Sequence, residues 1–225
     1  MKTIDLSHCI GPDMPVYPGT EPPRITQATT IAADGFAEKL LAMYSHTGTH
    51  MDAPAHMLAG GPTLDAIDAG RFVGPGIVLD VSFAAGGRVG PELIERNADR
   101  IAAAKWVLLR SGWSRYWGAE RYFEDFPVLS EEAARRLIEF DLHGVGVDMI
   151  SVDPVGDPDF GVHRILLGKG LVIVENLTDL SPLGNGGFTF VALPLRIKDG
   201  DGSPVRAAAL LVDQDQGRSC REQWG

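Results

Sequence analysis

Three runs within residues 106–147 decide the fold class: Trp106-Val107-Leu108-Leu109, Ser130-Glu131-Glu132 and Val145-Gly146-Val147. The first and last runs have strand length and are apolar without alternation, which is typical of strands buried on both faces of a sheet. Between them, Ser130 is a favourable N-cap, and the two glutamates lie in a first helical turn, where the helix dipole favours anions. A strand, a helix and a second strand in succession predict an α/β domain.

The same alternation continues on both sides of this segment. The helix after Ser130 is expected to be supported by the pairs Glu131–Arg135 and Glu132–Arg136 and to end near Gly144. A second helix is predicted after Gly90, with Pro91 at its first position and with Leu93, Ile94 and Ile101 facing inward. Further strands are expected in the apolar runs 77–79, 171–174 and 188–193.

Composition indicates one globular domain. The 225 residues show no break that would mark a linker, so we expect a single domain over residues 1–212 and a polar tail over 213–225. Thirty acidic against twenty basic residues give a net charge of −10, which argues against nucleic acid and anionic membranes as partners. The sequence contains no apolar run of membrane-spanning length and no signal-peptide segment. Only two cysteines, Cys9 and Cys220, are present, so a cytoplasmic location is expected.

Histidines cluster in one short segment. Three of the six lie within residues 46–56, where His46, His50, Asp52 and His56 have the same parity. In an extended chain such residues point to one face, and three imidazoles with a carboxylate are typical of a site for zinc, manganese or iron. The alternative is a polar edge strand whose histidines are hydrogen-bonded to their neighbours.

The segment 46–56 reads His-x-Gly-Thr-His-x-Asp-x-Pro-x-His and resembles the signature of the cyclase family of metal-dependent hydrolases, which includes bacterial kynurenine formamidase and isatin hydrolase. Segments 14–19, 109–113, 147–153 and 193–197 also resemble family segments. This resemblance implies a swivelling β/β/α-type core with helices packed on a mixed sheet, and it implies a homodimer.

The resemblance also implies a ligand set. His46, His50 and Asp52 would bind one metal ion, and Asp52 would bridge to a second ion held by His163 and Glu175. Two bridged cations lower the pKa of a shared water and polarise a substrate carbonyl. Glu175 has independent support, because it directly follows the apolar run 171–174, where a buried charge is costly without a cation.

Two further residues receive roles from the resemblance. His56 would be the general acid/base rather than a ligand, since a histidine titrates in the range that proton delivery to a leaving amine requires. Tyr17 stands where kynurenine formamidases resemble one another in carrying a tryptophan that contacts the aromatic substrate, so Tyr17 is a candidate substrate-binding residue. Asp148 and Asp153 bracket a predicted strand. They either hold the metal ligands in place or form turns, and neither is assigned to the site.

We therefore expect a metal-dependent amidohydrolase that cleaves an amide carbonyl of a small aromatic compound, of the N-formylkynurenine type. One or two divalent ions per chain are expected, Zn²⁺ first and Mn²⁺ second. One alternative is opening of a cyclic amide, as in isatin hydrolase, with manganese. The other is a non-catalytic metal or small-ligand binding protein. Structural zinc sites are usually closed and rich in cysteine, and the absence of cysteine from this ligand set favours catalysis.

Overall fold

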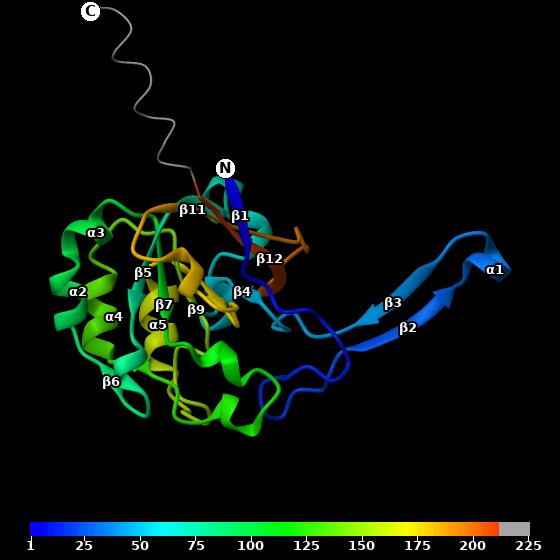
Figure 1. Ribbon diagram of the computed structural model, residues 1–225, viewed down its shortest axis with the longest axis horizontal. Coiled ribbons are helices and arrows are strands. Elements are labelled where there is room, and N and C mark those ends of the chain that lie inside the picture. Colours follow the sequence, from blue (N-terminus) through cyan, green and yellow to red (C-terminus); the bar gives the residue numbers. More distant parts are fainter. Residues whose placement is uncertain (212–225) are drawn as a thin grey trace, which may run out of the picture.

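One mixed sheet forms the body of the protein in the computed structural model, which describes residues 1–211 (Figure 1). The tail predicted at 213–225 lies outside the described residues. The strands of the sheet are β1 (Lys2–Asp5), β4 (His50–Asp52), β5 (Val73–Asp80), β7 (Trp106–Arg110), β9 (Gly144–Val147), β10 (Val172–Glu175), β11 (Phe188–Pro194) and β12 (Gly202–Leu211). Their order is β1-β12-β11-β5-β7-β9-β10-β4, and β12 also pairs with β4. Seven strands therefore close into a ring, with β1 attached to β12 from outside.

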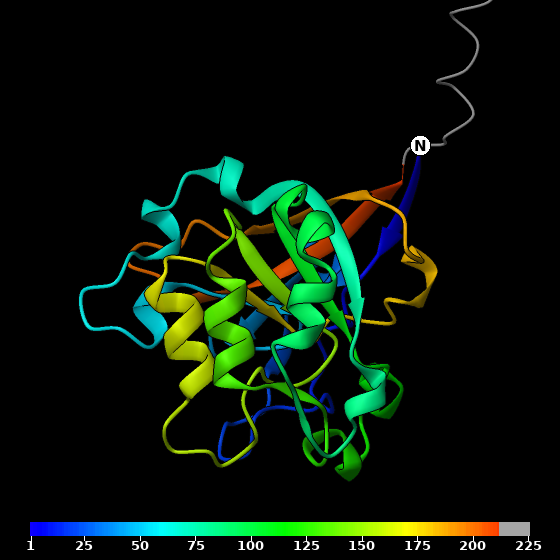
Figure 2. The ribbon, with the colours of Figure 1, turned by 90° about the vertical axis from the view of Figure 1, so that its left-hand side faces the viewer.

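The neighbours β5, β7, β9 and β10 run parallel, whereas every pairing of β1, β4, β11 and β12 is antiparallel. Helices α2 (Glu92–Arg96), α3 (Ala98–Ala102), α4 (Glu131–Leu137) and α5 (Gly161–Gly168) lie together on one face of the sheet (Figure 2). This arrangement confirms the predicted α/β fold with helices packed on a mixed sheet.

The predicted helices form, with different ends. Ser130 caps α4 by accepting a hydrogen bond from the amide of Ala133, and Glu131 pairs with Arg135 at 2.7 Å. The helix ends earlier than predicted, at Leu137, and Gly144 is the first residue of β9 rather than a helix stop. Arg136 pairs with Glu139 and not, as predicted, with Glu132. At α2, Pro91 is the N-cap and not the first helical residue, and the single helix predicted through Ile101 is divided at Asn97 into α2 and α3.

Two apolar layers bury the sheet on both sides. Ile77 and Leu79 of β5 pack in a cluster with the helices, whereas Val78 between them belongs to a second cluster. The second cluster draws side chains from β4, β5, β7, β10, β11 and β12, among them Trp106 and Phe190, and so fills the ring. Burial on both faces explains why these strands are apolar without alternation.

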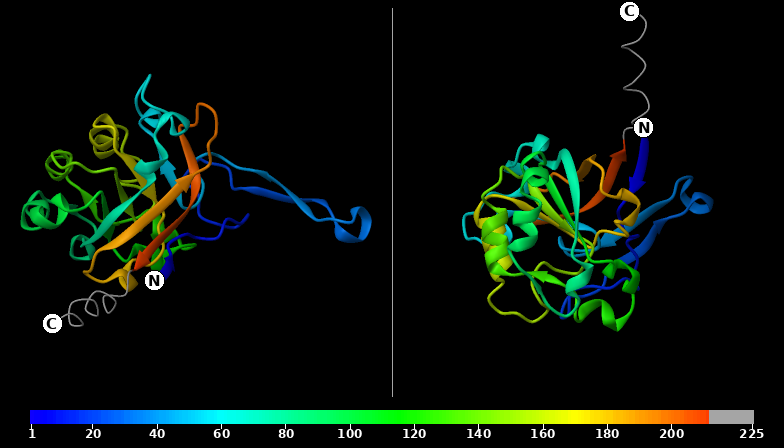
Figure 3. Two further views of the ribbon diagram at one scale, coloured as in Figure 1. Left: turned by 90° about the horizontal axis from the view of Figure 1, so that it is seen from above. Right: turned by 60° about the vertical axis from the view of Figure 1, so that its left-hand side comes forward.

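A hairpin projects from the body as an arm. Its strands are β2 (Arg24–Thr29) and β3 (Glu38–Ala42), with the short helix α1 (Ile31–Asp34) at the tip (Figures 1 and 3). No pattern in the sequence predicts this arm. None of the helices within residues 1–211 combines the length and the hydrophobicity that a bilayer span requires.

The remaining elements are short. Strands β6 (Arg88–Val89) and β8 (Val128–Leu129) form a separate parallel pair. The 3₁₀ helices are η1 (Pro54–His56), η2 (Leu64–Ala66), η3 (Ala69–Phe72), η4 (Ser82–Ala84), η5 (Trp113–Tyr116), η6 (Glu120–Phe123) and η7 (Ser181–Leu183).

Candidate metal centre

The pairing of β4 with β10 brings three candidate ligands to one face of the sheet. His50 is opposite Glu175 and Asp52 is opposite Ile173 in this antiparallel pair, so the four side chains point the same way. Ile173 belongs to the cluster with the helices, and Met51 faces the interior of the ring. The candidate centre therefore lies on the helix side of the sheet.

His46 and His56 reach this centre by a different route from the one predicted. The strand covers only His50–Asp52, so the expectation of one extended segment from 46 to 56 is wrong. Gly48, with a φ of +67°, turns the chain before the strand, and η1 turns it again at Pro54. The two turns still bring His46 and His56 together, with ring centroids 3.8 Å apart.

Helix α5 delivers His163. Asp153 accepts hydrogen bonds from the backbone amides of Val162 and His163, each at 2.9 Å, and from His163 Nδ1 at 2.7 Å. One carboxylate thus accepts from free backbone N–H groups at the start of the helix and also fixes the orientation of the imidazole. His163 Nε2 then lies 3.3 Å from Glu175 Oε1 and 3.7 Å from Asp52 Oδ2.

Asp52 is the centre of two groups of ligand atoms. Its Oδ1 lies 2.6 Å from His46 Nδ1 and 3.2 Å from His50 Nε2, and its Oδ2 faces His163. Oδ2 is buried without a hydrogen-bond partner among the described residues, and such an oxygen is costly unless a cation satisfies it. Ligand atoms that all lie within 4.8 Å of one another form two sets that share Asp52, namely His46, Asp52 and His56, and His50, Asp52 and Glu175. The side chains in these sets are of the types that bind a divalent ion.

Each candidate histidine ligand is also held by its other ring nitrogen, as is typical of metal-bound histidine. The three anchors are Gly48 O at 2.8 Å from His50 Nδ1, Asp153 Oδ2 at 2.7 Å from His163 Nδ1, and Asp201 Oδ2 at 3.2 Å from His46 Nε2. The nitrogens left over are the ones that face Asp52 and Glu175.

His56 differs from the other three histidines. Ligand atoms of His46, Asp52 and His56 lie within 4.8 Å of one another, so distance alone would admit His56 as a ligand. Within residues 1–211, however, its imidazole makes no hydrogen bond, and its closest carboxylate oxygen is Asp201 Oδ2, 3.9 Å from Nδ1. With 27% of its side chain exposed, His56 is the most accessible of the four histidines.

Charges in the centre separate the histidines further. Burial by itself would lower the pKa of His46, but the carboxylates of Asp52 and Asp201 raise it to about 9. Likewise, Asp153 and Glu175 outweigh burial and raise the pKa of His163 to about 10. Burial lowers the pKa of His56 to about 4, and the neighbouring imidazoles add to this effect. The carboxylates thus favour positive charge at His46 and His163, which a metal ion would supply in place of the protons.

Tyr17 and Asp148 lie apart from the ligand cluster. The hydroxyl of Tyr17 accepts a hydrogen bond of 3.3 Å from the amide of Gly156, in the loop that follows Asp153. Asp148 accepts hydrogen bonds from the amides of Ser111 and Gly112 and from the Ser111 hydroxyl, and it fixes the turn after β7. Burial raises the pKa of Asp148 to about 6.

Sequence reasoning did not single out Asp201. It lies in Asp199-Gly200-Asp201-Gly202, a composition that any tight turn between two strands would have. Asp153 stands at the end of a predicted strand, but no sequence pattern indicates its contact with His163.

The chain is similar to characterised proteins over nearly its whole length. The sequence model of the Cyclase family matches residues 4–154. Kynurenine formamidase from Bacillus cereus is 34% identical over 211 residues, which cover 92% of this chain and 98% of that protein. Isatin hydrolase A from Labrenzia aggregata, solved with benzyl benzoate, has a TM-score of 0.84 at 29% identity and 94% coverage of both chains.

A further solved structure, a predicted metal-dependent hydrolase from Bacillus stearothermophilus, has a TM-score of 0.76 at 29% identity and covers 92% of this chain and 97% of its own. The family match spans more than half of the chain, and the formamidase relative exceeds 30% identity over almost all of it. This chain belongs to the cyclase family.

Proposed function

We propose that this protein is a metal-dependent hydrolase that cleaves an amide carbon–nitrogen bond in a small aromatic compound. The observation that carries the proposal is the buried Asp52, whose two oxygens face two groups of imidazole and carboxylate ligands. Membership of the cyclase family and similarity to kynurenine formamidases and isatin hydrolases support the same reaction class.

The chain offers ligands for one or two divalent ions. His46, His50 and Asp52 would hold one ion, and Asp52, His163 and Glu175 would hold the other. Three imidazoles and two carboxylates favour Zn²⁺, with Mn²⁺ as the alternative. A divalent ion in this position lowers the pKa of a water and polarises a carbonyl oxygen.

His56 is the group proposed to move the proton. Burial lowers its pKa to about 4, below the range in which histidine ordinarily titrates, so the imidazole is neutral at pH 7. In this form it is proposed to accept a proton from the attacking water and to return it to the leaving nitrogen. Its partial exposure gives a substrate access to the ring. Because Nδ1 faces Asp201, Nε2 is the atom proposed to exchange the proton.

Tyr17 is proposed to contact the aromatic ring of the substrate. An open-chain N-formyl amide is the first candidate, in keeping with the 34% identity to kynurenine formamidase. A cyclic amide is the second, since isatin hydrolase A matches the fold with a TM-score of 0.84.

The test combines elemental analysis of protein purified without chelator with hydrolysis assays on N-formylkynurenine and isatin. We expect one or two transition-metal ions per chain, turnover of one of these substrates, and loss of turnover on chelation with recovery on adding Zn²⁺ or Mn²⁺. Bound metal without turnover of any aryl amide would favour a non-catalytic binding protein. Absence of metal, with no effect of added ions, would refute the proposal.

We also propose that the protein is a homodimer that works in the cytoplasm. The arm carries exposed apolar side chains that a second copy would cover, and Cys9 is an exposed free thiol, as a reducing compartment allows.

A further inference from the structure

We infer that Asp201 is a positioning residue of the metal centre, which orients His46 as a ligand and faces His56 with the same carboxylate oxygen. The inference rests on the proposed metal-dependent function. It concerns a residue far from the ligand motif in sequence, brought to it by the pairing of β12 with β4.

The backbone fixes Asp201 beside the ligand strand. Gly202 is paired with Asp52, and the carbonyl oxygen of Asp201 accepts a hydrogen bond of 2.9 Å from the amide of Ala53. The Ser45 hydroxyl donates to Asp201 Oδ1 at 3.0 Å. One carboxylate oxygen is therefore occupied, and the other, Oδ2, is directed to the histidines.

Oδ2 lies 3.2 Å from His46 Nε2 and 3.9 Å from His56 Nδ1. A metal-binding imidazole nitrogen must be free of its proton, and an acceptor on the other nitrogen keeps the proton there. Asp201 thus holds the hydrogen of His46 on Nε2 and leaves Nδ1 directed to Asp52, 2.6 Å from its Oδ1.

The turn itself also shapes the position of His46. A Cβ atom on Gly202 would lie 2.4 Å from His46 Cε1, so the imidazole packs directly on the backbone next to Asp201. The ring of His56 packs against the ring of His46, with an angle of 32° between the two planes. The two imidazoles and the carboxylate consequently form one packed unit, in which a shift of Asp201 displaces both rings.

The test measures metal binding and does not depend on knowing the substrate. Asp201→Ala and Asp201→Asn are compared with wild type, and Asp199→Asn is the matched control, an exposed aspartate of the same turn. The Zn²⁺ dissociation constant is measured by competition with a chromophoric chelator, and the visible spectrum of the Co²⁺-loaded protein reports ligand geometry.

We expect Asp201→Ala to weaken Zn²⁺ binding by about 10–100-fold and to alter the Co²⁺ spectrum, since loss of an outer partner of a ligand typically has this effect. Asp201→Asn should lose less, because its amide oxygen still accepts from His46 Nε2, and Asp199→Asn should match wild type. At saturating Zn²⁺, kcat of Asp201→Ala should still be reduced with little change in KM, because the carboxylate that faces His56 Nδ1 at 3.9 Å is gone.

Wild-type affinity and an unchanged spectrum in Asp201→Ala would overturn the inference, as would an equal loss in Asp199→Asn. If Asp201→Ala does not fold, Asp201→Leu, which also lacks an acceptor, replaces it, and equal Zn²⁺ affinity of this variant and Asp199→Asn refutes the role. Failure of wild type itself to bind metal would refute the proposed function, and this inference with it.

Discussion

Asp52 illustrates how strongly the centre depends on single residues. Its side chain is 1% exposed, and burial alone would raise the pKa of its carboxyl group. The imidazoles of His50 and His46 instead hold that pKa well below the usual range. A buried carboxylate that stays ionised requires positive charge close to it, and the candidate ion and its histidines meet this requirement together.

The division of roles among the histidines is testable at His56. In His56→Ala we expect turnover to fall by about 10²–10⁴-fold while metal content stays close to wild type, because the lost group transfers a proton and is not a ligand. Metal content is measured by elemental analysis alongside kcat. His143→Ala is the control, since His143 lies outside the centre, and it should keep full activity. Loss of metal together with activity in His56→Ala would make His56 a ligand.

The stability of the metal-free protein should depend on pH in a defined direction. The pKa values of His46 and His163, raised to about 9 and about 10, mean that the folded state holds protons that the unfolded state releases above about pH 6.5. Their stabilisation is complete below pH 6.5 and is lost as the pH rises through 9 to 10. His56 and His8, with pKa values lowered to about 4, act in the opposite direction and destabilise the fold as the pH falls below 6.5.

The measurement is the Tm of chelator-treated protein between pH 6.5 and 10, which we expect to fall. The Zn²⁺-loaded protein should show a weaker dependence over the same range, because the ion has replaced the protons on these histidines. A metal-free Tm that stays constant or rises toward pH 10 would contradict the charge distribution described for the centre.

At the scale of elements, β9 shows how the ring accommodates large side chains. Gly144 and Gly146 alternate with Val145 and Val147, which belong to the cluster beneath the helices. A Cβ at Gly146 would lie 2.5 Å from Leu108 Cδ2, and one at Gly144 would lie 2.7 Å from the ring of Trp106. The glycines of β9 therefore make room for side chains of β7, its neighbour in the sheet.

Gly144→Ala should destabilise the fold by about 1–3 kcal/mol, because the added methyl would meet the carbonyl oxygen of Val172 at 2.5 Å as well as the indole of Trp106. Urea unfolding of the metal-loaded protein measures the change. Gly168→Ala is the matched control, because the added methyl would meet nothing within 4 Å outside its own helix, and it should leave stability unchanged or slightly higher. Equal effects of the two substitutions would contradict this packing.

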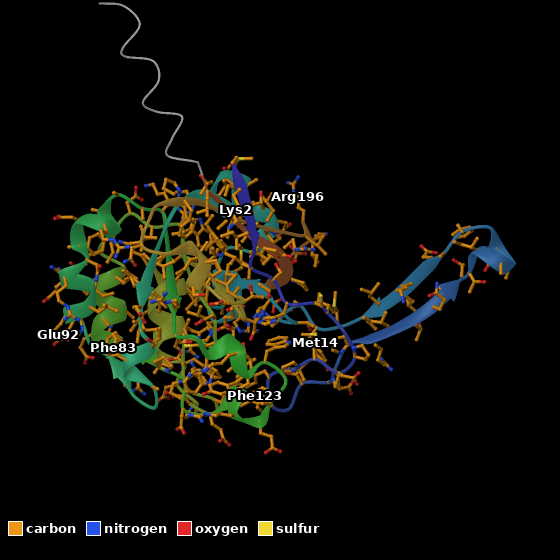
Figure 4. All side chains as sticks on the ribbon, in the orientation of Figure 1. Lys2, Met14, Phe83, Glu92, Phe123 and Arg196 are labelled. Atoms are coloured by element: carbon orange, nitrogen blue, oxygen red, sulfur yellow. The ribbon has the colours of Figure 1, made fainter. Side chains whose placement is uncertain are left out.

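At the scale of the whole molecule, the arm carries apolar side chains that nothing in the described part of the single chain covers. Ile31, Phe36, Leu40 and Leu41 are between 51% and 73% exposed, and Figure 4 shows the arm, with its side chains, extending away from the body. An isolated two-stranded hairpin is marginally stable in water, and monomers rarely expose such apolar surface. These observations support the proposed homodimer, with the arm as part of the interface.

Leu40→Asp is expected to weaken or abolish this dimer, because a carboxylate would have to be buried in the interface. Light scattering after size-exclusion chromatography should give the mass of two chains for wild type and one for the variant. Phe83→Asp is the control, since Phe83 is 67% exposed but lies on the body, away from the arm (Figure 4). A monomeric wild type, or the same shift in both variants, would refute the role of the arm.

The sequence by itself determined strands β5, β7, β9, β10 and β11 and most of the candidate ligands, but not the edge strand β1 or the long strand β12. Strands buried on both faces must be apolar at every position, so the runs around Leu108 and Val174 stand out locally. The ligands His46, His50 and Asp52 lie within one short motif, and Glu175 follows directly on a buried run. Patterns of this kind depend only on neighbouring residues.

Tertiary structure decided the closure of the ring, the projection of the arm and the place of Asp201. The pairing of β12 with β4 joins residues about 150 positions apart, and Asp201 meets His46 across 155 positions. The predicted extended segment is interrupted at Gly48, which has a φ of +67° and lies so close to Ile10 and Met14 that an added Cβ would come within 3.3 Å of each side chain. Contacts between distant segments arise from the packing of the whole chain. The residues around a glycine or aspartate in a turn therefore do not indicate whether that residue touches a metal ligand.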